Sequence, residues 1–135
     1  QLGSRLFLTD AGLETMLVFH DGMELPAFAS FPLLDTRDGT NRLRAYYRHC
    51  LAHATRLGCG FILESPTWRA SADWGEQLGY TAAGLADRNA RAMTLMSELR
   101  EEFAHTGLPI VISGNVGPRG DAYDPASVDA IEDYE

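Results

Sequence analysis

The chain has 135 residues, of which 45% are hydrophobic and 22% charged, and its formal net charge is −8 at pH 7. This length and composition are typical of one folded globular domain and exclude an intrinsically disordered chain. The negative charge argues against nucleic acid as a partner, because nucleic-acid binding relies on basic side chains that contact phosphates. The sequence has no apolar run long enough to cross a membrane and no signal peptide at its start. We therefore expect a cytoplasmic protein with no membrane partner.

The reactive side chains narrow the chemistry further. All 11 basic residues are arginine, so a lysine Schiff base and a lysine general base are excluded within this chain. Cys50 and Cys59 have no zinc-site or redox spacing, which favours buried free thiols. His49 and His53 are four apart, but the sequence offers no third ligand. This pair therefore indicates two surface histidines rather than a metal site.

The first predicted strand covers residues 5–9 and leads into the sequence TDAGLET at residues 9–15. Asp10 falls at the carboxyl end of this strand, which is where ligands bind in parallel α/β folds. A structural role explains the same residues, since Asp10 would cap the following turn or helix and Gly12 would supply an unusual backbone angle. Both alternatives stay open for this loop. Glu14 is expected to be a first-turn acid favoured by a helix dipole.

The remaining elements follow in chain order. Apolar residues at helical spacing predict helices over residues 41–57 and 85–106, and apolar runs predict strands at 60–64 and 109–114. A third helix is expected to begin near residues 124–125, where an acid precedes a proline. This alternation predicts an α/β fold with a parallel sheet. Because the last helix has no stop signal, we expect residues 1–135 to be the N-terminal portion of a larger domain.

Each predicted strand is followed by a polar loop. The second loop reads ESPTWRAS at residues 64–71, and the third reads SGNVGPRG at 113–120. Because carboxyl ends of parallel strands meet at one edge of a sheet, the three loops are expected to face one crevice. Glu64 is either a ligand contact or the ion-pair partner of Arg69. Trp68 and Trp74 would close the top of the core, or stack on a ligand.

The order of these motifs resembles the homocysteine S-methyltransferase family, which includes betaine-homocysteine methyltransferase and the homocysteine module of methionine synthase. Residues 9–15 are similar to the family's Asp-Gly-Gly loop, and residues 46–60 to its helix that leads into an Ala-Gly-Ala-Asp type turn. The sequences TWRAS at 67–71 and GNVGP at 114–118 are similar to its Thr-Tyr-Gln-Ala-Ser and Gly-Ser-Ile-Gly-Pro loops. The chain departs from the family pattern at four positions, which are Ala11, Glu64, Pro66 and Asn115.

This resemblance implies a zinc-dependent (β/α)8 TIM barrel, of which the chain covers about the first three β/α units. It implies methyl transfer to the thiol of homocysteine or a related thiol amino acid, as in methionine biosynthesis. The partners would be that amino acid and a methyl donor, and a homo-oligomer is left open. The family's three zinc-binding cysteines would lie beyond residue 135, so this segment would hold no metal ligand and no catalytic residue, and alone it would be inactive.

The segment would instead supply the amino-acid-binding loops. In this interpretation Asp10 accepts hydrogen bonds from the substrate ammonium, and backbone N–H groups near Gly12 or Asn115 receive the carboxylate. The residues expected to bind substrate are Asp10, Ala11, Gly12, Glu64, Thr67, Trp68 and Asn115. The alternative is a non-catalytic ligand-binding or regulatory module of the same fold that lacks the metal half.

Overall fold

The computed structural model describes residues 5–10, 12–118 and 120–121. In chain order the elements are β1 (Phe7–Thr9), α1 (Leu13–Phe19), the 3-10 helices η1 (Pro26–Phe28) and η2 (Phe31–Asp35), α2 (Arg37–Leu57), β2 (Gly60–Glu64), α3 (Ala72–Gln77), α4 (Ala82–Glu102), the 3-10 helix η3 (Ala104–Thr106) and β3 (Ile110–Ser113). Two predictions lie outside the described residues: the role of Ala11 and the helix near residues 124–125.

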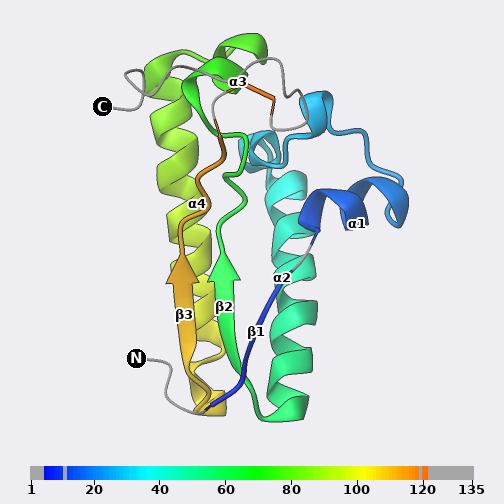
Figure 1. Cartoon of the computed structure of the whole chain (residues 1–135), viewed down its shortest axis with the longest axis vertical. Coiled ribbons are helices and arrows are strands. Elements are labelled where there is room, and N and C mark those ends of the chain that lie inside the picture. The colour runs from blue at the N-terminus through cyan, green and yellow to red at the C-terminus, as the bar shows by residue number, and fades with distance from the viewer. Residues whose placement is uncertain (1–4, 11, 119, 122–135) are drawn as a thin grey trace.

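The three strands form one parallel sheet in the order β1-β2-β3 (Figure 1). Phe7 pairs with Gly60, and at the other end of the sheet Glu64 pairs with Ser113. The predicted strands and their parallel arrangement are confirmed, although β1 begins at Phe7 and β3 covers only Ile110–Ser113. The described residues are therefore an α/β unit, and the closed barrel stays a prediction.

Helix α2 begins earlier than its apolar pattern indicates, at Arg37 rather than at residue 41. The side chain of Thr36 caps the helix by accepting a hydrogen bond from the Gly39 backbone N–H at 3.0 Å. Gly39 disfavours a helix on propensity alone, but a Cβ there would lie 2.2 Å from the Leu33 carbonyl oxygen. Glycine is therefore required because η2 packs directly on the first turn of α2.

Helix α4 also begins at a threonine cap, earlier than its apolar pattern indicates. It begins at Ala82 rather than at residue 85, because the Thr81 side chain accepts a hydrogen bond from the Gly84 N–H at 3.1 Å. The predicted end at residue 106 falls in η3, a separate turn that follows Glu102. Both helices therefore start at a threonine cap that precedes the first apolar residue of the pattern.

The core lies between one face of the sheet and the two long helices, which stand behind the strands in Figure 1. Its fully or nearly fully buried side chains include Leu43, Tyr47, Leu51, Phe61, Leu63, Leu95, Met96 and Leu99. Burial of each such apolar side chain contributes about 1.5–3 kcal/mol. This packing fixes the sheet against α2 and α4, and so fixes where the strand ends lie.

The opposite face of the sheet has no cover among the described residues. Strand alternation and register place Phe7, Ile62 and Val111 on this face, and Val111 is 40% exposed. Parallel sheets are usually covered on both faces. The uncovered face is therefore a surface that a further layer or a closed barrel would bury.

No helix in the described part of the chain is both long enough and apolar enough to span a membrane. The two cysteines are free thiols, as predicted: Cys59 is buried and Cys50 is half-buried.

Candidate functional site

The carboxyl ends of β1 and β2 carry two acidic residues, Asp10 and Glu64. The Thr9 hydroxyl donates a hydrogen bond to Glu64 Oε1 at 3.0 Å, across the two paired strands. This bond ties the two strand ends together at the edge where the sequence predicted a ligand site, at the upper end of the sheet in Figure 1.

Asp10 is an unusually placed carboxylate. The Tyr46 hydroxyl of α2 donates a hydrogen bond to its Oδ2 at 3.3 Å, while its Oδ1 is buried and has no hydrogen-bond partner among the described residues. Burial, and after it the negative charge of Glu64, raise the pKa of Asp10 from its ordinary value of 3.8 to about 6, although the hydrogen bond from Tyr46 opposes the rise. Asp10 is therefore a desolvated acid with one unsatisfied oxygen.

A third carboxylate, Glu14, lies in the first turn of α1, as predicted. It accepts a hydrogen bond from the Ser30 hydroxyl at 2.6 Å, and its charge also raises the pKa of Asp10. Among the described residues, no ion pair involves Asp10, Glu14 or Glu64. In the part of the chain that the structure describes, this edge of the sheet is therefore acidic, and no basic side chain pairs with its carboxylates.

The structure separates the two interpretations of the first loop. Gly12 has a backbone φ of +94° and is the N-cap residue of α1, so its structural role is confirmed. No side chain caps this helix. The expectation that Asp10 might serve as the cap is wrong, because its carboxylate faces Tyr46 instead.

The second and third loops are joined by buried hydroxyls. The Thr67 hydroxyl lies 2.7 Å from Ser65 Oγ and donates to the Asn115 carbonyl oxygen at 2.8 Å. The Asn115 backbone N–H donates to Ser65 Oγ at 3.1 Å. Ser65 therefore occupies this one N–H group, while the expectation that N–H groups near Gly12 or Asn115 receive a ligand carboxylate stays a prediction. A pocket of about 150 Å³ lies beside these residues.

The predicted convergence of the site residues is met in part. Thr67 and Asn115 are in contact, and Asp10 and Glu64 lie at the same end of the sheet. No hydrogen bond between described residues joins the carboxylates to the Thr67–Asn115 pair. The two groups are therefore neighbouring parts of one edge rather than one network.

Arg69 does not neutralise Glu64, so the ion pair suggested by their spacing is wrong. Its guanidinium lies 3.8 Å from the ring centre of Trp74 and 4.8 Å from that of Trp68. It donates hydrogen bonds to the Ala27 carbonyl oxygen and to Asp121. The two tryptophans thus pack on Arg69, and Glu64 keeps its negative charge without this counterion.

Sequence reasoning missed three residues that shape this edge, namely Ser30, Tyr46 and Ser65. Tyr46 was noted only as part of a helix motif, because helical spacing does not say which side chain reaches a strand end. Ser65 directly follows Glu64 in the second loop, so its position next to a strand end could have indicated that it belongs to this edge. Ser30 follows no strand, and no local pattern marks it.

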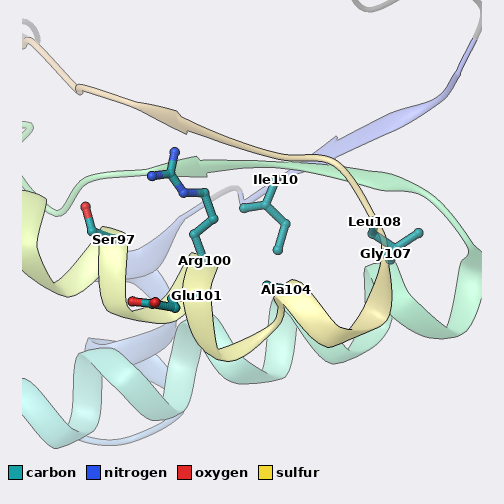
Figure 2. Close-up of a pocket in the computed structure, with 7 residues that line it drawn as sticks. All are labelled: Ser97, Arg100, Glu101, Ala104, Gly107, Leu108 and Ile110. Carbon is teal, nitrogen blue, oxygen red and sulfur yellow. The ribbon is translucent and has the colours of Figure 1, made fainter.

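Further pockets lie elsewhere on the described residues, and two of them bear on the site. One of about 590 Å³ lies where the end of α4 meets the start of β3, at the opposite end of the strands, and Figure 2 shows Arg100, Glu101 and Ile110 among its lining residues. Another of about 440 Å³ is lined by Tyr46, His49 and other residues of α1, α2 and the turn after α1. Only the second touches a residue of the acidic edge.

The described residues do not fit a zinc centre. No three His, Cys, Asp or Glu side chains among them are grouped as metal ligands. The Nε2 atoms of His49 and His53 lie 3.1 Å apart on the surface of α2, as expected for a surface pair.

Comparison of the chain with protein-family models, with curated proteins and with solved structures found no match. The resemblance to the homocysteine S-methyltransferases therefore rests on the order of the four sequence motifs.

Proposed function

We propose that this chain supplies the amino-acid-binding loops of a (β/α)8 methyltransferase that transfers a methyl group to the thiol of homocysteine or a related thiol amino acid. The observation that carries the proposal is Asp10, a desolvated carboxylate with a free Oδ1 at the carboxyl end of a parallel sheet. Ligands bind at this end in parallel α/β folds. The order of the sequence motifs supplies the choice of substrate class.

A substrate ammonium group complements this edge of the sheet. It would donate a charge-assisted hydrogen bond to Asp10 Oδ1 and lie close to the charge of Glu64. The loss of water around Asp10 strengthens such a contact. Since Oδ1 is enclosed in the unliganded chain, we expect binding to include a local rearrangement of the Asp10 side chain or its neighbours.

Proton release would accompany this binding. An ammonium beside Asp10 favours its charged form and lowers its pKa from about 6. Near pH 6, where the free carboxyl is about half protonated, binding would therefore release a fraction of a proton.

We assign the described residues no role in holding zinc or in making the new bond, because they do not fit a metal site. The zinc that the resemblance implies would be held by cysteines beyond residue 135. The contribution of this chain is recognition and orientation of the amino acid.

Calorimetry on the full-length protein tests this proposal with two probes, homocysteine and 4-mercaptobutanoate, which is homocysteine without its amino group. Loss of the ammonium contact should weaken binding by about ten- to a hundredfold. Equal affinities would exclude ammonium recognition. Homocysteine binding without methyl transfer would favour the regulatory module over the enzyme.

A further inference from the structure

Arg69 is a charged side chain held almost entirely inside the protein. Only 8% of it is exposed. The central carbon of its guanidinium lies 4.8 Å from the ring centre of Trp68 and 3.8 Å from that of Trp74, so both aromatic rings pack against the cation. The guanidinium forms its hydrogen bonds in its own plane, through the N–H groups at its edge.

That edge joins segments that are distant in the sequence. One terminal nitrogen donates to the Ala27 carbonyl oxygen at 2.9 Å, and the other contacts Asp121 Oδ1 at 3.4 Å. The Trp74 indole N–H donates to the Gly120 carbonyl oxygen at 3.0 Å. Arg69 thus connects the loop after β2 with the α1–α2 connection and with the loop after β3.

The hydrogen bond from Arg69 to Ala27 reaches a turn whose backbone φ angles are unfavourable. Ala27 and Phe28 have φ angles of +52° and +55°, which L-residues with a Cβ rarely adopt. Such a turn persists only when surrounding contacts hold it. The hydrogen bond from Arg69 is a contact of this kind.

The turn leads directly to the acidic edge. Ser30, which is 2% exposed, follows it and donates its hydroxyl hydrogen bond to Glu14 at 2.6 Å. Ser30 Oγ also lies 3.4 Å from the Pro66 carbonyl oxygen, in the same loop as Arg69. The position of the Glu14 carboxylate therefore depends on the course of the chain between Ala27 and Ser30.

We propose that Arg69 is a positioning residue: through the Ala27–Phe28 turn it holds Ser30 against Glu14 and so fixes the carboxylate whose charge acts on Asp10 of the amino-acid site. Its effect on ligand binding rests on the proposed function, whereas its effect on the turn does not. Lysine would not replace it, because an ammonium has neither the flat faces for two rings nor the forked edge for two acceptors.

Hydrogen–deuterium exchange on the full-length protein tests the effect on the turn. With Arg69→Lys, amides in residues 25–30 should exchange about tenfold faster, while those of β2 keep their protection. Arg88→Lys is the matched control, because Arg88 also lies over an aromatic ring, that of Tyr80, and pairs with acids, but it belongs to α4. It should leave residues 25–30 unchanged. Unchanged exchange in the Arg69 variant would overturn the proposal.

A second variant separates this role from general support of the fold. Glycine adopts positive φ without a Cβ penalty, so Ala27→Gly added to Arg69→Lys should restore much of the protection of residues 25–30. The same rescue is expected if Arg69→Lys alone unfolds the protein. If Ala27→Gly restores neither the protection of residues 25–30 nor the fold of the Arg69→Lys variant, then Arg69 does not act through this turn.

Homocysteine affinity provides the functional readout. Arg69→Lys should weaken binding by about two- to thirtyfold, and Ala27→Gly should recover part of that loss. If the wild type binds no homocysteine, the proposed function fails while the exchange data still decide the role of Arg69. If the wild type binds and Arg69→Lys binds equally well, the link from Arg69 to the site is wrong.

Discussion

Asp10 combines burial with two negatively charged neighbours, and this combination has a consequence for stability. Its pKa is about 6 in the folded chain against an ordinary value of 3.8. The folded state therefore binds more protons than the unfolded state between these values, and stability falls as pH rises through this window. At neutral pH the ionised, buried carboxylate of Asp10 therefore lowers the stability of the folded protein. Such a loss of stability is common at functional sites.

Replacement of Asp10 by asparagine should remove this pH dependence. At pH 7 we expect Asp10→Asn to be more stable than the wild type by about 1–2 kcal/mol, since solvent screening reduces the full effect of the shift. Near pH 4 the two should have similar stability. Urea unfolding at several pH values measures the difference.

Glu102→Gln is a control whose effect on stability should have the opposite sign, because a direct hydrogen bond from Arg48 lowers the pKa of Glu102. It should be less stable than the wild type at pH 7, and this loss should shrink as the pH falls. An Asp10→Asn variant that is less stable than the wild type at pH 7 would contradict the account of Asp10.

At the residue scale the sequence located Asp10 and Gly12 but not their contacts. Asp10 directly follows an apolar run, so its place at a strand end could be predicted from the chain alone. Tyr46, which bonds it, lies in a helix, and the rotation of that helix against the sheet is set by packing. Pairing of Arg69 with Glu64 was one of two alternatives that their spacing left open, whereas two tryptophans and the Ala27 carbonyl determine where Arg69 lies.

At the element scale the long helices and strands could be predicted because their apolar patterns are regular. Their starts could not be predicted from those patterns, because each helix begins directly after a capping threonine that lies several residues before the first apolar residue of the pattern. In α2 the early start also depends on Gly39, which reads as a helix breaker until its close contact with Leu33 is known. Short elements such as α1 and α3, with seven and six residues, are too short to show a period.

The cap of α2 can be tested directly. Thr36→Ala removes the acceptor for the Gly39 N–H and should cost about 1 kcal/mol of unfolding free energy. Thr94→Ala is the matched control, because Thr94 is exposed within α4 and its hydroxyl bonds only the Ala90 carbonyl oxygen. It should be neutral or slightly stabilising. Equal effects of the two substitutions in chemical denaturation would show that Thr36 is not a significant cap.

At the scale of the whole molecule, the uncovered sheet face and the two outer strands dominate the behaviour of the chain. Phe7, Ile62 and Val111 lie on that face, and in the described sheet β1 and β3 each pair on one side only. Exposed edges of this kind favour association with other chains. The strands could be predicted from the sequence, but their pattern could not show which face of the sheet the helices leave open.

We therefore expect residues 1–135, expressed alone, to be oligomeric or poorly soluble. Val111→Lys should reduce association by placing a charge on the open face of an edge strand. Size-exclusion chromatography with light scattering measures both. A monodisperse wild-type monomer that unfolds cooperatively would show that the open face needs no cover.

The central claim is that Asp10 recognises the ammonium group of a thiol amino acid. Calorimetry of zinc-loaded, full-length wild type and Asp10→Asn, each with homocysteine and with 4-mercaptobutanoate, tests it most directly. Loss of one charge-assisted hydrogen bond should cost about 1.5–3 kcal/mol, on the order of ten- to a hundredfold in homocysteine affinity. Binding of the amino-free probe and zinc content should both be unchanged by the substitution. Homocysteine binding that is equally tight in the variant, or absent in the wild type, would contradict the account.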